Sequence, residues 1–292
     1  MSISPKIVFF GSGPVASATL EALLPHFAIE AIITKPRQPG HRGTVPVLEF
    51  AQAHNVPYFT PSNKKELSEL FSSATFTSQV GLVVDYGIII SRPVIDFFPK
   101  GIVNSHFSLL PYWRGADPIT FSILGGRPKT AGVSLMLINE KLDEGELLAQ
   151  EPFKLSPTIT TPELTDALVK QSNKLLTRIL PNYLNGLVKP YAQPPITPTF
   201  SRKLTKEDSL LDTHKTAHQL ALEVRAFAGW PKSKINLFGH TVIVKKARVA
   251  QNAADGALVV PCGGHTFLEI LELTAPSGKT MHGADFLRGY KK

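Results

Sequence analysis

Three polar side chains in the middle of the chain have the chemistry needed to act on a carbonyl group. Asn104 and His106 follow the short apolar run 102–103, and Asp143 lies farther along, before a turn that contains glycine. An asparagine amide and a histidine ring can both donate to a developing oxyanion, and losing one such donor costs about 3 kcal/mol of transition-state stabilisation. A carboxylate that removes a proton or polarises the imidazole contributes on the order of 100- to 10,000-fold in rate.

The same residue types also occur where no reaction takes place. An Asn-x-His pair can be a hydrogen-bonded loop pair, and Asp-x-Gly is a frequent turn sequence because both residues favour turn conformations. The spacing alone therefore leaves both interpretations of Asn104, His106 and Asp143 open. Arg114 is open in the same way, since it can stack on Trp113 at the surface or be a buried arginine.

A sheet of parallel strands would bring these residues to one edge. Apolar runs predict strands at residues 6–10, 28–34, 80–84 and 101–104, and helical spacing is found after Gly13 and at residues 45–54 and 161–184. This alternation predicts a doubly wound α/β domain. If its fourth strand ends at Val103, Asn104 and His106 emerge at the carboxyl end, where open α/β sheets bind ligands, and share one face.

A proline-rich stretch follows this domain. Residues 189–198 contain four prolines, which lack a backbone donor and exclude helix or sheet interior. We expect a catalytic domain over residues 1–188, a linker over 189–203 and a C-terminal domain over 204–292. In the last domain, a helix at 214–227 precedes short alternating runs separated by Gly, Pro and Asn, which predict a small β-barrel.

Charge is distributed unevenly along the chain. Residues 1–200 carry 17 Lys/Arg and 15 Asp/Glu, whereas residues 201–292 carry 14 and 8, so the last third accounts for +6 of the net +8. This asymmetry favours a polyanionic partner, because neutralised phosphates release counterions, although a merely soluble basic surface is the alternative. No run approaches the roughly 20 apolar residues of a membrane span, and no signal-peptide pattern is present, so we expect a cytoplasmic protein. The single cysteine, Cys262, agrees with a reducing compartment and excludes a multi-thiolate metal site.

The turn after the first strand has a competing interpretation. Gly11-x-Gly13-x-x-Ala16 fits the dinucleotide-binding fingerprint, with Glu30 in roughly the place of the ribose-binding acid, and would indicate a nicotinamide dehydrogenase. However, the pattern is short and contains Pro14, and a tight strand-to-helix turn needs glycines whether or not a phosphate binds. A tight turn without a bound dinucleotide is therefore the preferred interpretation.

The segment around the three polar residues strongly resembles the methionyl-tRNA formyltransferase family. The most specific block is Asn104-x-His106 with Ser108-Leu109-Leu110-Pro111-x-Trp113-Arg114-Gly115-Ala116-x-Pro118. The pairs Gly132-x-Ser134 and Leu142-Asp143-x-Gly145 are similar to the signature of the wider folate-dependent formyltransferase superfamily. The likeness covers nearly the whole chain and continues in Arg225-Ala226-Phe227-x-x-Trp230-Pro231 and Val244-x-Lys246-Ala247.

The resemblance implies an enzyme that transfers the formyl group of 10-formyltetrahydrofolate to the amino group of initiator methionyl-tRNA, giving N-formylmethionyl-tRNA for translation initiation. It implies a Rossmann-like catalytic domain, an OB-like C-terminal barrel that helps hold the tRNA, and no metal. Asn104 and His106 would stabilise the oxyanion while Asp143 assists proton transfer. We expect a monomer without membrane association.

The resemblance also implies binding residues. The folate would contact the segments after the third and fourth predicted strands: Tyr86, Gly87, Ile88, Ile89, Ser108, Leu109, Leu110 and Pro111. The tRNA substrate would contact Gly11, Arg37, Arg42 and Arg114. Arg37 and Arg42 belong to the segment 35–44, which corresponds to the family's acceptor-stem loop, and the alternative is a solvated basic loop.

Three other classes remain as alternatives. A sugar-nucleotide N-formyltransferase shares Asn-x-His, the Ser-Leu-Leu-Pro block and the distal aspartate, but its tail is not expected to be so basic. A glycinamide ribonucleotide formyltransferase would lack the second domain. A non-catalytic RNA-binding protein would explain the basic barrel but not the spacing of Asn104, His106 and Asp143.

Overall fold

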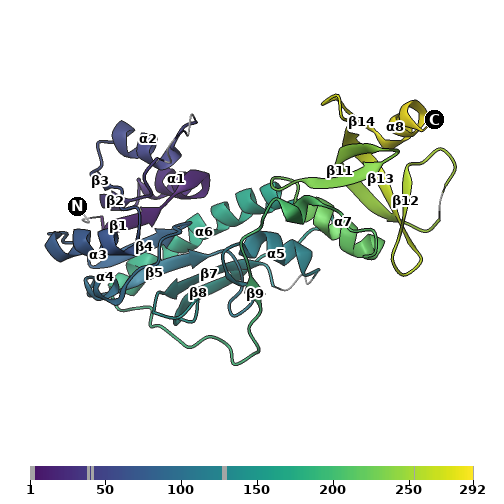
Figure 1. The fold of residues 1–292 in the computed structure, drawn as a ribbon. Helices are drawn as coiled ribbons and strands as arrows, with labels where there is room; N and C mark the ends of the chain where they lie inside the picture. Colours follow the sequence, from purple (N-terminus) through teal and green to yellow (C-terminus); the bar gives the residue numbers. More distant parts are fainter. Residues whose placement is uncertain (1–3, 38–39, 41–42, 127–129, 253, 292) are drawn as a thin grey trace. The chain divides into compact units, whose positions relative to one another are not determined.

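The computed structural model describes residues 4–37, 40, 43–126, 130–252 and 254–291. The chain divides into two compact units (Figure 1). Unit 1 comprises Met1–Gly115, Thr130–Phe153 and Asp166–Phe200. Unit 2 comprises Ala116–Lys129, Lys154–Thr165 and Ser201–Lys292, so it contains two segments that precede the proline-rich stretch.

A seven-stranded sheet forms the centre of unit 1, with its strands in the order β3-β2-β1-β4-β5-β7-β8 (Figure 1). The first five are parallel, and β7 and β8 extend the sheet in antiparallel fashion. The strands are β1 (Lys6–Gly11), β2 (Ala28–Ile33), β3 (Tyr58–Phe59), β4 (Val80–Val84), β5 (Ile102–His106), β7 (Gly132–Leu137) and β8 (Leu147–Pro152). The order of the parallel strands is the one found in Rossmann-like domains, as predicted.

The strands β1 and β4 are buried along nearly their whole length, which indicates that helices cover both faces of this sheet. Alternate side chains of β1 serve different faces: Val8 and Phe10 join a cluster with Phe71 and Phe98, so Ile7 and Phe9 face the other way. The helices are α1 (Gly13–Leu23), α2 (Pro46–Ala53), α3 (Lys64–Ser73), α4 (Arg92–Asp96) and α6 (Thr161–Leu184), which begins in unit 2. The predicted doubly wound α/β class is confirmed.

Unit 2 contains a five-stranded antiparallel sheet in the order β10-β11-β13-β12, with β14 paired to β13. Its strands are β10 (Ser233–Leu237), β11 (His240–Ala250), β12 (Val259–Cys262), β13 (Thr266–Thr274) and β14 (Thr280–His282). The other elements of unit 2 are α5 (Pro118–Leu124), the short 3-10 helix η1 (Glu207–Ser209), α7 (Ala217–Ala226) and α8 (Gly283–Tyr290). Two short strands outside both sheets, β6 (Arg114–Gly115) of unit 1 and β9 (Phe200–Ser201), pair with each other. Leu220 of α7, Leu268 of β13 and Phe286 of α8 are fully buried in its core. Of the helices in the described residues, none has the length and apolar character needed to cross a membrane.

The glycine pattern after β1 has a packing explanation. A Cβ atom at Gly11 would lie 2.6 Å from the Cβ of Ala16 and 2.7 Å from the carbonyl oxygen of Val84, so only glycine fits. The carboxylate of Glu30 accepts hydrogen bonds of 2.5 to 3.0 Å from the N–H and hydroxyl groups of Thr77 and Ser78. Neither feature therefore calls for a dinucleotide, and the dehydrogenase hypothesis loses its support.

Glu30 also predicts a pH-dependent contribution to stability. Burial raises the pKa of its carboxyl group, but the hydrogen bonds from Ser78 and Thr77 outweigh this and lower the pKa from 4.5 to about 2. A lowered pKa in the folded state stabilises the protein above pH 4.5, and this contribution is lost as the pH falls toward 2. In denaturant titrations, the free energy of unfolding of Glu30→Gln should lie below that of the wild type near neutral pH, and the gap should shrink across this range. A difference in the free energy of unfolding that does not change with pH would contradict a lowered pKa of Glu30.

Candidate active site

Asn104 and His106 lie within β5, not beyond its end. The strand continues past Val103 because residues 103–106 pair antiparallel with β7, while Asn104 also pairs with Val83 of β4. The strand therefore extends beyond the predicted range of 101–104, since an antiparallel neighbour extends the ladder of hydrogen bonds. The two side chains still share one face of the sheet, because they are two residues apart on one strand.

The structure brings His106 and Asp143 together. His106 is buried, its Nε2 lies 3.0 Å from the carbonyl oxygen of Trp113, and its Nδ1 lies 3.9 Å from Oδ2 of Asp143. Because a carbonyl can only accept, Nε2 carries a hydrogen. In a neutral ring Nδ1 is then the acceptor and faces a carboxylate, whereas in the imidazolium form Nδ1 becomes a donor toward Asp143. Nδ1 of His106 and the carboxylate of Asp143 thus face each other directly.

Asp143 is held by the backbone around it. Its Oδ2 accepts a hydrogen bond of 2.8 Å from the N–H of Gly115, and its own φ of 49° lies in the left-handed region, where such strain persists only if the surroundings enforce it. The turn requires the following Gly145, because a Cβ atom there would collide with the carbonyl oxygen of Leu137. The carboxylate therefore has a fixed position beside His106.

Among the described residues of the site, the side chain of Asn104 differs from those of His106 and Asp143 in making no hydrogen bond or ion pair. It is half buried, and within the described part of the chain no hydrogen bond engages its amide group. An amide on the same strand face as His106 can donate to an oxygen placed there. The arrangement therefore offers a donor, an imidazole and a carboxylate to a carbonyl substrate, as required for addition of a nucleophile.

A further residue, Gln193, connects the turn that carries Asp143 to the rest of unit 1. Gln193 donates from Nε2 to the carbonyl oxygens of Asp143 (2.7 Å) and Gly145 (3.0 Å). Its Oε1 accepts a hydrogen bond of 2.8 Å from the Nη2 of Arg114, whose Nη1 lies 2.9 Å from Oε1 of Glu144. Arg114 is buried, so these contacts place it in the framework of the site. No sequence signal identified Gln193, which lies in the stretch expected to be a linker.

The segment expected to bind the folate pterin follows β4 at its carboxyl end. Tyr86 and Ile88 pack against the core of unit 1, and burial raises the pKa of the Tyr86 hydroxyl well above its usual range. Ile89 instead exposes 75% of its surface, and Gly87 leaves room for the ammonium group of Lys35, with which any Cβ atom would collide. The exposed part of this segment is thus limited to Gly87 and Ile89 and lies beside the start of the 35–44 loop.

The segment 108–111 is held rigidly. The hydroxyl of Ser134 donates to the carbonyl of Ser108 (2.6 Å) and accepts from the N–H of Leu110 (3.0 Å). Ser108, Leu110 and Pro111 are buried, whereas Leu109 is partly exposed and packs over Gly132, where a Cβ atom would come within 2.7 Å of it. These contacts explain why Gly132-x-Ser134 accompanies the Ser-Leu-Leu-Pro block.

The residues expected to bind the tRNA substrate are distributed over several elements. Gly11 ends β1 in a buried position, Arg37 is exposed, and Arg114 is engaged with Gln193 and Glu144. Arg42 lies outside the described residues. In the part of the chain that the structure describes, no group of three or more His, Cys, Asp or Glu side chains could hold a metal ion.

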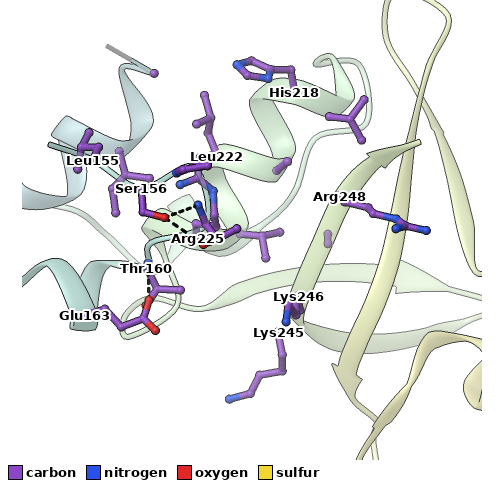
Figure 2. Close-up of a pocket in the computed structure, with 18 residues that line it drawn as sticks. Leu155, Ser156, Thr160, Glu163, His218, Leu222, Arg225, Lys245, Lys246 and Arg248 are labelled. Atoms are coloured by element: carbon purple, nitrogen blue, oxygen red, sulfur yellow. Dashed lines mark hydrogen bonds between the residues drawn. The ribbon is translucent and has the colours of Figure 1, made fainter. Parts of the chain in front are cut away.

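Unit 2 has a candidate binding surface of its own, a cavity of about 870 Å³ between α5, residues 155–160, α7 and β11 (Figure 2). Apolar side chains such as Leu155 and Leu222 line it together with cationic ones. The cationic residues are Arg225, Lys245, Lys246 and Arg248, to which His218 adds a titratable ring. Arg225 is half buried and donates to the carbonyl of Ile159, and burial lowers the pKa of its guanidinium. We name this feature the α7–β11 cavity.

Comparison with known proteins identifies the family. The profile described as Formyl transferase matches residues 5–180, and the one described as Formyl transferase, C-terminal domain, matches residues 203–291. A Myxococcus xanthus protein named methionyl-tRNA formyltransferase is 32% identical, with 98% of this chain and 96% of the relative covered. The chain belongs to the formyl transferase family. A Chloroflexus aurantiacus relative of the same name is 33% identical, with 97% and 96% covered.

Solved structures share the fold of this formyl transferase. An N-formyltransferase from Helicobacter canadensis, in complex with folinic acid and dTDP-3-aminofucose, has a TM-score of 0.69 at 16% identity, covering 91% of this chain and 98% of the other. The structure of WlaRD, a sugar 3N-formyl transferase, has a TM-score of 0.70 at 18% identity, covering 91% and 97%. Residues 181–202 of this formyl transferase lie between the two profile matches and belong to neither. This stretch includes Gln193.

Proposed function

We propose that this formyl transferase moves the formyl group of 10-formyltetrahydrofolate to the amino group of initiator methionyl-tRNA. The single observation that carries the proposal is the full-length similarity to proteins named methionyl-tRNA formyltransferase, in a chain whose His106, on the same strand as Asn104, lies 3.9 Å from Asp143. The product, N-formylmethionyl-tRNA, serves translation initiation, so we expect the enzyme to act in the cytoplasm and as a monomer.

The geometry supports a direct transfer between the two substrates. The methionyl amine attacks the formyl carbon, and the amide of Asn104 donates to the oxygen that becomes negative. His106 lies on the same strand face and stabilises the same charge, and the carboxylate of Asp143 faces its Nδ1. Asp143 receives the proton that the amine loses on forming the new C–N bond. When the bond to the folate nitrogen breaks, that nitrogen takes up a proton, so no covalent enzyme intermediate is required.

The folate site is proposed at the carboxyl ends of β4 and β5. Gly87 offers exposed backbone there, and Ile89 offers apolar surface. The rigid segment 108–111, which consists of Ser108, Leu109, Leu110 and Pro111, follows directly after β5. Tyr86 and Ile88 are core residues that shape this segment. Pterin rings suit such sites, since small-molecule pockets are largely apolar with a few placed polar groups.

The tRNA is proposed to contact both parts of the chain. Residues 1–188 would form the catalytic domain, 189–203 the connection, and 204–292 the tRNA-binding domain, with Gly11, Arg37, Arg42 and Arg114 near the acceptor end. The basic α7–β11 cavity supports a role of unit 2 in holding phosphates, since it gathers lysine and arginine side chains in the part of the sequence with net charge +6.

The test is a formylation assay with two classes of acceptor. Purified protein receives 10-formyltetrahydrofolate with charged initiator methionyl-tRNA, and in parallel a panel of nucleotide-linked amino sugars. Formyl transfer to the tRNA alone is expected. Turnover of an amino sugar without turnover of the tRNA would overturn the acceptor assignment and favour the sugar formyltransferases that share the fold.

The proposed tRNA contact predicts a salt-dependent effect of the α7–β11 cavity. Replacing Lys245 and Lys246 with glutamine should raise the KM for tRNA. It should also reduce the slope of log affinity against log salt concentration by about 2, since each phosphate contact contributes about 1 to that slope. The KM for the folate should stay unchanged. The matched control replaces Lys64 and Lys65, two consecutive exposed lysines of unit 1, with glutamine. Equal salt slopes in wild type and the Lys245/Lys246 variant would refute a phosphate contact there.

A further inference from the structure

Gln193 joins the proline-rich stretch to the turn that carries Asp143. Two hydrogen bonds run from its Nε2, to the carbonyl oxygens of Asp143 and Gly145, and one reaches its Oε1 from Arg114. It is half buried within a stretch, 191–197, whose other residues are exposed. A polar side chain with this orientation in an otherwise exposed segment indicates a specific contact.

The backbone next to Gln193 strengthens the connection. Tyr191 and Leu147, the first residue of β8, exchange both of their backbone hydrogen bonds, with N–O distances of 2.7 and 2.9 Å. The proline-rich stretch is thereby paired to the edge of the sheet immediately after the Asp143 turn. Gln193, two residues beyond Tyr191, then reaches the carbonyl groups of the turn itself.

Asp143 needs such support for a physical reason. Its backbone is in the left-handed region, which a non-glycine residue adopts only when its surroundings enforce it. The carboxylate is fixed at one oxygen by the N–H of Gly115, but the direction of the side chain also depends on the backbone of the turn. The hydrogen bonds from Gln193 hold that backbone on both sides of Glu144.

We propose that Gln193 is a positioning residue, which keeps Asp143 at Nδ1 of His106 by holding the carbonyl groups of the Asp143 turn. This inference rests on the proposed function for its kinetic consequence, but its structural consequence is independent of any substrate. Without Gln193 the turn relaxes from its strained conformation, and the carboxylate moves away from the imidazole. A displacement of about 1 Å in a catalytic group can cost roughly 100-fold in rate.

Two substitutions at Gln193 separate its two kinds of contact. Gln193→Ala removes both, and kcat for formyl transfer should fall by about 10- to 100-fold while the KM values for tRNA and folate change little. In Gln193→Glu the carboxylate can still accept from Arg114 but cannot donate to the two carbonyl groups. We expect Gln193→Glu to lose as much activity as Gln193→Ala. Full activity of Gln193→Glu would assign the effect to Arg114 and overturn the proposal.

The matched control is Gln171. Its Nε2 also donates to two backbone carbonyls of unit 1, those of Glu151 and Pro152, away from the Asp143 turn. Gln171→Ala should keep kcat, and both alanine variants should show similar Tm values. An equal loss of kcat in Gln171→Ala would show that only general stability is affected, which contradicts a positioning role.

A readout without substrate separates this inference from the proposed function. In nitrogen-15 NMR spectra of the full chain, the ring signals of His106 should shift in Gln193→Ala and stay in place in Gln171→Ala, because only the former moves Asp143. An unchanged His106 signal in Gln193→Ala would refute the positioning role whatever the substrate is. If the wild type fails to formylate methionyl-tRNA while the signal shifts as expected, the substrate assignment fails and the role of Gln193 stands.

Discussion

Replacing His106 with alanine is expected to lower kcat for formyl transfer by about 100- to 1,000-fold, with smaller changes in the KM for either substrate. The ring is buried, and its two nitrogens face the Trp113 carbonyl and the Asp143 carboxylate, so alanine removes the group that couples Asp143 to the reacting carbonyl. Steady-state kinetics with charged initiator methionyl-tRNA measure the effect.

The chain offers a matched control for His106. His54 in unit 1 lies 3.8 Å from Glu21, a histidine–carboxylate distance close to that of His106 and Asp143, but it is more exposed and follows directly after α2. His54→Ala should retain the wild-type kcat. If His106→Ala also retains it while remaining folded, the imidazole takes no part in the reaction.

Asp143→Asn is expected to lower kcat by about 100- to 10,000-fold without loss of stability. The amide oxygen of asparagine can still accept from the N–H of Gly115, so the turn keeps its hydrogen bond. The neutral amide cannot take the proton of the attacking amine. The loss is therefore electrostatic, and it should appear in kcat measured under saturating tRNA and folate.

The control for Asp143→Asn is the same substitution at Asp96, another carboxylate of unit 1. It forms an exposed ion pair with Arg92 on α4, and surface pairs of this kind contribute little to stability. Asp96→Asn should behave as wild type in the same assay. Retention of full kcat in Asp143→Asn would exclude the carboxylate as a proton acceptor and leave it only the role of orienting the turn.

Hydrophobic periodicity predicted the framework of the fold well where elements are long or fully buried. The helix expected at 161–184 is α6, Thr161–Leu184, and the buried strand expected at 80–84 is β4. The extent of β5 was not predictable in this way. Its last residues are polar, and they remain in the strand because β7, which sequence analysis did not identify, pairs with them from more than twenty residues away.

The candidate site was predicted only in part, for a similar reason. Asn104, His106 and Asp143 belong to recognisable motifs, and the structure places His106 and Asp143 in proximity. Gln193 acts on backbone carbonyl groups, which every residue carries, so no complementary side-chain pattern marks its partners. The prolines around it indicated an irregular segment correctly but gave no sign that this segment contacts the site.

The pairing of β5 on both sides holds two of the three site residues within the sheet. Asn104 and His106 cannot change their spacing without opening the ladders to β4 and β7, whereas the segments around them are loops and turns. The distance between these two side chains is therefore set by the sheet itself and does not depend on the conformation of any loop.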